Sequence, residues 1–322
     1  MDNILITSAG QRVSLVKFFQ QEIKKLNSEN KVYTIDSAPI LAPACIISDG
    51  YEKVCNVTNP NYIDTLLTIC KKWKIKIIIP TIDTELLILS ENKNFLLDNG
   101  IIPIISSPDF VKKCRDKYLT NIFFSTNNIN TPKIIDKKKL KFPLFIKPYD
   151  GSSSKNTHIV KNISELSDAH LSNPKLMFME YIDPALYDEY TVDAYYDKQH
   201  QLKCLVPRKR IFVRAGEINK GVTHKNEIVN FIKSRLNKIE GAIGCLTMQF
   251  FFNPDTKKII GIEINPRFGG GYPLSYSAGA NYPKYIIDEY ILNKEIEFFD
   301  NWENNLLMLR YDNEVLVHNY VK

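Results

Sequence analysis

The sequence lacks the signals of a secreted, membrane-spanning or zinc-stapled protein. No stretch approaches the ~20 consecutive apolar residues that a membrane helix needs. The N-terminus enters a strand-like run at residues 4–7 with no basic segment before it, so no secretory signal is visible. The six cysteines are scattered and form no C-x-x-C pair. We therefore expect a cytoplasmic protein without a structural zinc site and without a membrane partner.

The usual signatures of a side-chain nucleophile and of dinucleotide binding are also missing. There is no G-x-S-x-G and no paired Cys/His signature, and the five histidines show no metal-ligand spacing. The turn at residues 8–12 reads SAGQR and lacks G-x-G-x-x-G, although Asp36 ends the next strand as a ribose-binding acid would. A dinucleotide-dependent oxidoreductase is therefore the least favoured alternative.

Length and charge are those of an ordinary globular protein. The 322 residues suffice for two or three structural units, with 44% hydrophobic and 24% charged residues. The net charge is +6, and dense basic runs occur only at 137–139 and 207–210. No nucleic-acid module accompanies them, so we predict an anionic small ligand and not a nucleic acid.

The pattern of elements changes near residue 108. Before it, short apolar strands alternate with helical segments, which predicts a parallel sheet covered by helices. The expected strands are 4–7, 31–35, 75–79 and 101–105, and the expected helices are 13–26, 62–72 and 85–99. A helix at 110–124 opens the next unit, and an α+β region follows it. Its expected strands are 142–148, 157–160, 177–181, 189–196, 201–206, 247–252 and 259–264, with helices at 163–170 and 227–241.

The last two of these strands carry the most informative side chains. Glu263 and Asn265 are two residues apart on one strand and so share a face. Antiparallel pairing across the turn at 253–255 brings Gln249 beside them. Three converging oxygen donors with little charge suit Mg²⁺ that carries a phosphorylated nucleotide. The alternative is an ordinary hairpin with one solvated polar face.

A second candidate site lies around Lys147, which ends an apolar strand. The small-residue loop that follows contains Gly151, Ser152 and Ser153, whose backbone can approach phosphates closely and move as a flap. A plain surface turn is the alternative. The backbone of segment 178–182 can read an adenine edge between apolar side chains, unless it is an ordinary strand end.

Three arginines, Arg208, Arg210 and Arg214, flank another strand-like segment. A guanidinium recognises carboxylate or phosphate in a bidentate manner. One of them is expected to face the substrate or the γ-phosphate, but the sequence does not say which. A solvated basic cluster remains the alternative.

Together these motifs resemble those of the ATP-grasp superfamily, and their residues are most similar to the large-subunit branch of carbamoyl phosphate synthetase. The matching segments are 80–86, 116–117, 146–148, 178–182 and 263–267. The resemblance implies a Rossmann-like pre-ATP-grasp domain at 1–108 and a two-lobed ATP-grasp fold. The small lobe with the phosphate loop would span 109–182, and the large lobe with the metal site would span 183–322. The large subunit itself carries two ATP-grasp units, whereas this chain has room for one.

The resemblance also implies roles for single residues. It makes Lys117, otherwise a solvated helix lysine, a second phosphate-binding residue beside Lys147. It assigns the ribose hydroxyls to Glu189, with Asp188 as a substitute, and charge stabilisation during catalysis to Arg267 and Lys147. The implied nucleotide-binding set is Lys117, Lys147, Gly151, Ser152, Ser153, Glu180, Tyr181, Ile182 and Glu189, and the implied metal ligands are Gln249, Glu263 and Asn265.

The function that the resemblance implies is an ADP-forming ligase that uses ATP and Mg²⁺, with Mn²⁺ as a substitute. A carboxylate would become an acyl phosphate, which an amine or a thiol then attacks. The expected partners are small-molecule carboxylate and amine substrates, and a homodimer is left open. A non-catalytic nucleotide-binding protein with the same fold is the alternative.

Overall fold

The computed structural model describes residues 2–151, 156–214 and 216–320. Its N-terminal part is a five-stranded parallel sheet in the order β3-β2-β1-β4-β5. The strands are β1 (Asn3–Thr7), β2 (Val32–Asp36), β3 (Tyr51–Lys53), β4 (Ile75–Ile79) and β5 (Ile102–Pro103). The helical segments are α1 (Val13–Leu26), η1 (Pro39–Leu41), α2 (Pro43–Ile46), α3 (Tyr62–Lys72), α4 (Asp83–Glu91) and α5 (Lys93–Asp98). The predicted α/β pattern is confirmed, and the carboxyl ends of β1 and β4 lie side by side at its centre.

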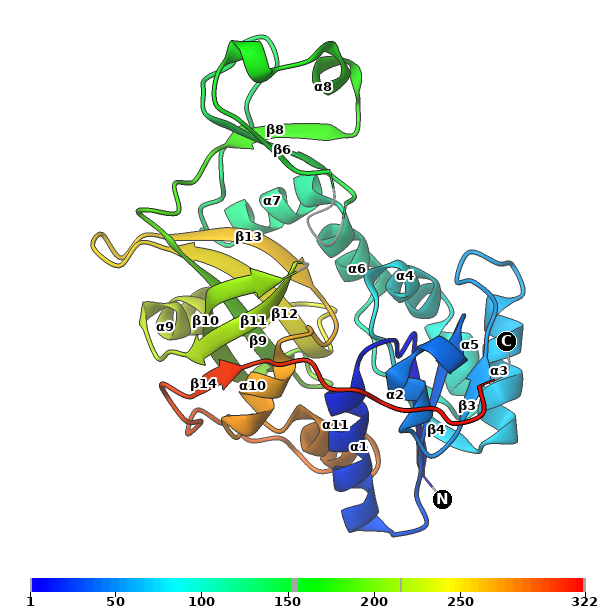
Figure 1. Ribbon diagram of the computed structural model, residues 1–322. Helices are drawn as coiled ribbons and strands as arrows, with labels where there is room; N and C mark the ends of the chain where they lie inside the picture. Colours follow the sequence, from blue (N-terminus) through cyan, green and yellow to red (C-terminus); the bar gives the residue numbers. More distant parts are fainter. Residues whose placement is uncertain (1, 152–155, 215, 321–322) are drawn as a thin grey trace.

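A small antiparallel sheet projects from the rest of the molecule (Figure 1). Its strands are β6 (Leu144–Pro148), β7 (His158–Val160) and β8 (Leu176–Glu180), in the order β7-β6-β8. The short segments η2 (Ile163–Glu165) and α8 (Asp168–Ser172) cover it, and α6 (Pro108–Arg115) and α7 (Lys117–Thr126) precede it in the chain. This small lobe has an apolar core of its own, so it packs as a separate unit.

The third sheet has six antiparallel strands in the order β13-β12-β9-β10-β11-β14. They are β9 (Asp188–Tyr196), β10 (Leu202–Arg214), β11 (Glu217–Thr223), β12 (Gly244–Phe252), β13 (Ile259–Asn265) and β14 (Leu307–Leu309). The helices of this large lobe are α9 (Glu227–Arg235), α10 (Tyr272–Ser277) and α11 (Tyr282–Tyr290). Both α6 and α7 also contact β13, so they connect the two lobes.

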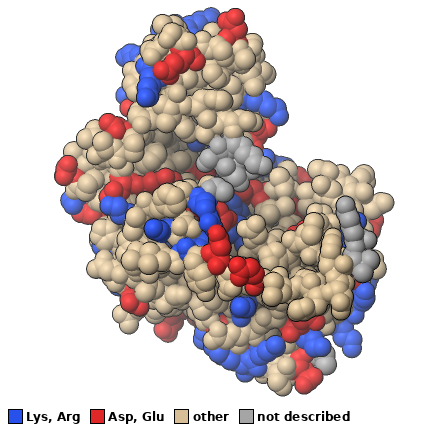
Figure 2. All heavy atoms as spheres, viewed as in Figure 1, with Lys and Arg blue, Asp and Glu red and all other residues tan. Residues whose placement is uncertain are grey.

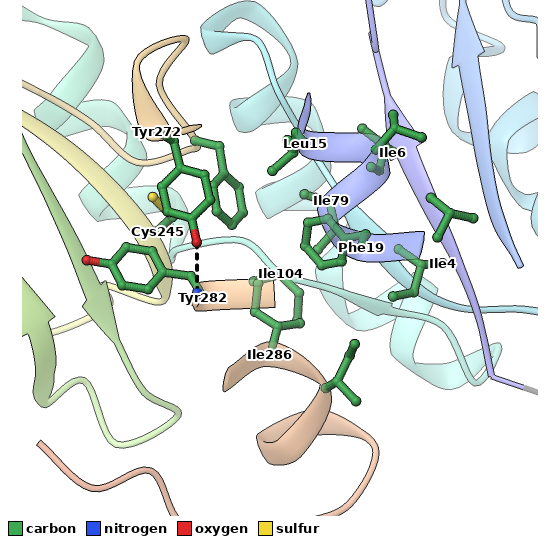
Figure 3. Close-up of a cluster of buried hydrophobic side chains, with 14 of the residues drawn as sticks. Ile4, Ile6, Leu15, Phe19, Ile79, Ile104, Cys245, Tyr272, Tyr282 and Ile286 are labelled. Atoms are coloured by element: carbon green, nitrogen blue, oxygen red, sulfur yellow. Dashed lines mark hydrogen bonds between the residues drawn. The ribbon is translucent and has the colours of Figure 1, made fainter. Parts of the chain in front are cut away.

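One apolar cluster joins the N-terminal sheet to the large lobe (Figure 3). Phe19 of α1 and Ile79 of β4 belong to the same buried cluster as Tyr272 and Tyr282 of the large lobe. The hydroxyl of Tyr272 accepts a hydrogen bond from the backbone N–H of Tyr282 at 2.8 Å. Because this core is continuous, the N-terminal turns are held in place against the large lobe.

Two predicted long helices are wrong in their extent, because each is two helices. The segment 85–99 breaks at Asn92, whose side chain donates to the carbonyl of Ile88 at 2.8 Å. The segment 110–124 breaks at Asp116, whose carboxylate caps α7 by accepting from the next N–H groups. The second break places Lys117 at the first position of α7.

Other boundaries also differ from the predictions. The strand expected at 201–206 continues to Arg214, and the helix expected at 227–241 ends at Arg235. The sequence analysis predicts no helix or strand at α2, β3, β11, β14, α10 and α11.

Candidate functional site

A cavity of about 720 Å³ lies between the small lobe, the large sheet and the turns of the N-terminal sheet. Acidic and basic side chains gather side by side across the middle of the molecule, below the projecting small lobe (Figure 2). All of the predicted site residues that the structure describes line this cavity, which are Lys117, Lys147, Gly151, Glu180, Tyr181, Ile182, Glu189, Gln249, Glu263, Asn265 and Arg267. Ser152 and Ser153 lie outside the described residues.

The oxygen donors of the closing hairpin meet as expected from strand alternation. Gln249 is directly opposite Glu263 in the β12–β13 ladder. The amide groups of Gln249 and Asn265 both donate to Oε1 of Glu263, each at 3.0 Å. Among the described residues no group of three or more His, Cys, Asp or Glu could hold a metal. Glu263 is thus the one full negative charge in a set of hard oxygen donors, which fits Mg²⁺ only together with an anionic ligand.

Lys147 lines the same cavity as this trio, and among the described residues no counter-ion pairs with it. Its side chain is 7% exposed, and its ammonium makes no hydrogen bond or ion pair within the described part of the chain. Its ammonium lies 6.0 Å from the centroid of the Phe145 ring. Burial lowers the pKa of Lys147 to about 8, with Glu263 opposing the shift and Lys117 adding to it. A buried ammonium in this state gains most from an anion that enters the cavity.

Lys117 holds the base of the predicted phosphate loop. Its ammonium donates to the carbonyl of Gly151 at 2.6 Å. Burial lowers the pKa of Lys117, and Glu263 opposes this. The Asp116 cap fixes the start of α7 and so places this ammonium near the one on Lys147. Lys117 is therefore a buried cavity residue and not the solvated helix lysine that its local pattern suggests.

The adenine and ribose candidates lie on the strands that connect the two lobes. The carboxylate of Glu180 accepts from the N–H of Lys133 at 3.2 Å, so it is held at the cavity rim. Glu189 forms an ion pair with Arg210 at 3.2 Å. Burial raises the pKa of Glu189, while Arg210 opposes the rise. Asp188 pairs with Lys209 at 2.7 Å, and Asp188 does not line the cavity.

The structure separates the three arginines of β10. Arg208 is 1% exposed, and Asp193 accepts from its Nε at 2.9 Å and from its Nη2 at 3.0 Å. Arg210 lines the cavity beside Glu189. Arg214 is exposed and pairs with Asp312, and it does not line the cavity. The candidates for the arginine that faces the substrate or the γ-phosphate are therefore reduced to Arg208 and Arg210.

Arg267 is fixed by a residue of the N-terminal part. Asp83, at the start of α4, accepts from its Nε at 3.0 Å and from its Nη2 at 2.9 Å. Nη1 donates to the carbonyl of Phe268 at 3.2 Å. Burial alone would lower the pKa of Arg267, but Asp83 and then Glu263 raise it, so the guanidinium stays charged. Asp83 belongs to the motif at 80–86, yet its pairing with Arg267 was not predicted.

Two further charged residues of the cavity were also missed, Arg12 and Glu217. Glu217 pairs with Arg12 at 3.2 Å and with Arg310 at 3.1 Å. A Cβ on Gly270 would lie 2.1 Å from a carboxylate oxygen of Glu217, so this position must remain glycine for the carboxylate to stay there. The glycine run at 269–271 thus leaves room for charged side chains that pack against its backbone. The sequence of the run alone does not reveal this reason for its glycines.

The comparisons with known proteins agree with this architecture. Residues 4–105 match the family model of the PylC-like N-terminal domain. Residues 172–308 match the model described as ATP-grasp in the biosynthetic pathway with Ter operon. No curated protein matches the sequence significantly.

Several solved structures share the fold at low sequence identity. Biotin carboxylase from Campylobacter jejuni superposes with a TM-score of 0.68 at 16% identity, over 90% of this chain and 70% of that one. N5-carboxyaminoimidazole synthetase from Staphylococcus aureus superposes with a TM-score of 0.71 at 15% identity, over 96% of this chain and 80% of that one. L-amino acid ligase from Bacillus licheniformis superposes with a TM-score of 0.68 at 16% identity, over 90% of this chain and 74% of that one. This chain thus has the fold of these solved structures, with one region that matches a PylC-like N-terminal domain and another that matches an ATP-grasp domain.

Proposed function

We propose that the protein is an ADP-forming ligase that activates a carboxylate with ATP and transfers the acyl group to an amine or a similar nucleophile. The observation that carries the proposal is Lys147, which is largely buried and has no hydrogen-bond or ion-pair partner among the described residues, in the same cavity as Glu263, Gln249 and Asn265. A nucleotide triphosphate supplies the negative charge that both groups lack. Solved structures with this fold hold such ligands, including β-γ-ATP and ADP.

The chemistry needs no protein nucleophile, which agrees with the motifs that the sequence lacks. One oxygen of the substrate carboxylate attacks the γ-phosphorus, the bond to the bridging oxygen breaks, and ADP leaves with the electron pair. The amine then attacks the acyl carbon, inorganic phosphate leaves, and the amine nitrogen loses a proton. The protein acts by positioning and electrostatics.

The roles of the side chains follow from their places in the cavity. Lys147 and Lys117 neutralise the phosphates, and the carbonyl contact of Lys117 with Gly151 holds the loop base ready. Arg267, held by Asp83, stabilises charge that develops on the transferred phosphoryl group. Gln249, Glu263 and Asn265 would hold Mg²⁺, or Mn²⁺, which would supply positive charge to neutralise the phosphates. The segment 180–182 and Glu189 contact the adenosine.

The setting of this activity is part of the proposal. In the described part of the chain, no helix is long and apolar enough to cross a membrane. All six cysteines are free thiols. We place the enzyme in the cytoplasm, acting on small-molecule carboxylate and amine substrates.

The oxidoreductase alternative loses its main support in the N-terminal turn. The carboxylate of Asp36 accepts from the N–H of Gly10 at 3.1 Å and from the N–H of Ala38 at 3.0 Å. A ribose-binding acid has to offer these oxygens to the cofactor. Here the acid instead closes the turn of its own chain.

The test is an ADP-release screen across amino acids and other carboxylic acids, with and without amines, for the native protein and Glu263→Gln. At least one acid should stimulate ADP release in the native protein. Glu263→Gln should abolish the release and leave the thermal midpoint unchanged, because the trio lines a cavity and contributes little to the core. Glu240→Gln, at an exposed carboxylate, is the matched control and should retain full activity. Full activity in Glu263→Gln would refute the metal assignment, and a loss of its thermal midpoint would make Glu263 structural.

A further inference from the structure

The end of the cavity next to the N-terminal sheet is lined by charged groups from three distant parts of the chain. Arg12 follows the turn after β1, Glu217 begins β11, and Asp83 begins α4. The two oxygens of Glu217 contact Nη1 of Arg12 at 3.2 Å and Nη1 of Arg310 at 3.1 Å. This group of residues adjoins Arg267 through the Asp83 pair. We call Arg12, Asp83, Glu217, Arg267 and Arg310 the N-terminal charge cluster.

Arg12 is the guanidinium of this cluster that keeps an edge for a ligand. Its side chain is 19% exposed, and within the described ranges its only side-chain polar partner is Glu217, at Nη1. In contrast, Arg267 uses Nε and Nη2 on Asp83 and Nη1 on the carbonyl of Phe268. The Nε and Nη2 groups of Arg12 are therefore available for bidentate binding of an anion.

The charges of the cluster do not balance. Arg12, Arg267 and Arg310 carry three positive charges, whereas Asp83 and Glu217 carry two negative charges, which leaves one positive charge in excess. Burial lowers the pKa of Arg12, Glu217 opposes this, and Arg267 and Arg310 add to it. A partly buried cation that two neighbouring positive charges repel is stabilised by one further negative charge.

The cluster adjoins the metal trio, because Asp83 lines a smaller pocket together with Glu263 and Asn265. Glu263 acts to raise the pKa of Arg267. A carboxylate that reacts beside Lys147 and Glu263 therefore lies near Arg267. The free edge of Arg12 lies in the same cavity, on the turn after β1, and serves another group.

We propose that the substrate acid carries a second anionic group, a carboxylate or a phosphate, and that Arg12 binds it. The proposal rests on the ligase function proposed above and names the class of its acid substrate. Glu217 is a positioning residue that holds Arg12, and Gly270 leaves the space that this carboxylate occupies. The N-terminal turn thus selects the acid, while the lobes hold the nucleotide.

The experiment compares the native protein with Arg12→Gln and Arg12→Lys. The acids are those with one anionic group (acetate, propionate, alanine), dicarboxylates (succinate, glutarate, aspartate, glutamate) and phosphorylated acids (O-phosphoserine, 3-phosphoglycerate). ADP release gives kcat and KM for each acid and for ATP, and calorimetry gives acid binding with Mg²⁺ and a non-hydrolysable ATP analogue. The native protein should prefer one of the two dianionic classes. Arg12→Gln should raise KM for that acid about 10- to 100-fold without changing KM for ATP.

Two further variants separate a binding role from a structural one. Arg12→Lys keeps the charge without the fork and should restore part of the affinity. Gly270→Ala should raise KM for the same acid, because the added methyl group displaces Glu217 and with it Arg12. Arg235→Gln removes an exposed arginine of α9 and is the matched control that should change nothing.

Each outcome decides between the proposals. If a dianionic acid binds in an Arg12-dependent manner but never stimulates ADP release, the ligase function fails and the role of Arg12 stands. If an acid stimulates release and Arg12→Gln leaves its KM unchanged, the role of Arg12 is refuted and the ligase function stands. A preference for acids with one anionic group, or a dependence on Arg12 that appears only with the amine, also refutes the second anionic group. The same holds if no acid of the panel binds.

Discussion

Nucleotide binding should be coupled to proton uptake at Lys147. Burial lowers the pKa of this lysine to about 8 in the ligand-free protein, whereas an ordinary lysine titrates near ~10.4. Bound phosphates restore the ordinary value, because they stabilise the charged form. At pH 8 about half of the lysines are neutral before binding and nearly all are charged after it. The expected uptake is therefore about 0.5 proton per nucleotide.

Calorimetry at pH 8 in two buffers with different ionisation enthalpies measures this uptake directly. The apparent binding enthalpy of a non-hydrolysable ATP analogue with Mg²⁺ should depend on the buffer in the native protein. In Lys147→Met the dependence should shrink by about 0.5 proton, while Lys138→Met, at an exposed lysine, should behave as the native protein. A buffer-independent enthalpy in the native protein would refute the reasoning.

The same shift in pKa predicts how stability depends on pH without nucleotide. The folded-state pKa of Lys147 lies below the unfolded value, so between about pH 8 and pH 10.4 the unfolded chain binds more protons. The free energy of unfolding should gain about 2.5 kcal/mol from this residue across that window as the pH rises. Urea unfolding of the native protein and of Lys147→Met at pH 8 and pH 10 tests this prediction. It would be contradicted if the free energy of unfolding changed by the same amount between the two pH values in both proteins.

Two simpler substitutions test other parts of the cavity. Lys147→Ala should weaken nucleotide binding by about 1.5–3 kcal/mol because a charge-assisted phosphate contact is lost, whereas Lys138→Ala should not, and equal affinities by calorimetry would return Lys147 to a structural role. Asp193→Asn should lower the free energy of unfolding by about 3–5 kcal/mol, because it leaves the buried guanidinium of Arg208 without its counter-ion. Urea unfolding measures this loss, and a value below about 1 kcal/mol would show that the fold does not depend on this ion pair.

Local periodicity predicts the parts of this protein that depend on local chemistry. Strand alternation alone places Glu263 and Asn265 on one face and Gln249 opposite them, as the β12–β13 register has it. The helices at 13–26 and 62–72 are confirmed at both ends, because amphipathic patterning and flanking turns agree there.

The missed features depend on contacts between distant segments. Arg267 meets Asp83 across 184 positions of the chain, and Arg12 meets Glu217 across the interface between the N-terminal sheet and the large lobe. No periodic pattern encodes such pairs. The break at Asp116 is different, because an aspartate with its carboxylate on the next turn is a recognisable cap, and the amphipathic pattern on both sides hid it.

The division of the cavity between two parts of the chain has a consequence for how such proteins diversify. In the proposed function the residues that bind phosphate and metal all come after residue 108, whereas Arg12 and Asp83 come from the two central turns of the N-terminal sheet. Exchange of these turns between relatives would alter acid preference while the nucleotide machinery remains intact. The continuous apolar core restricts this exchange, since a grafted domain must also fit Tyr272 and Tyr282. New specificities in this architecture should therefore arise by point changes in the turns more readily than by recombination of whole domains.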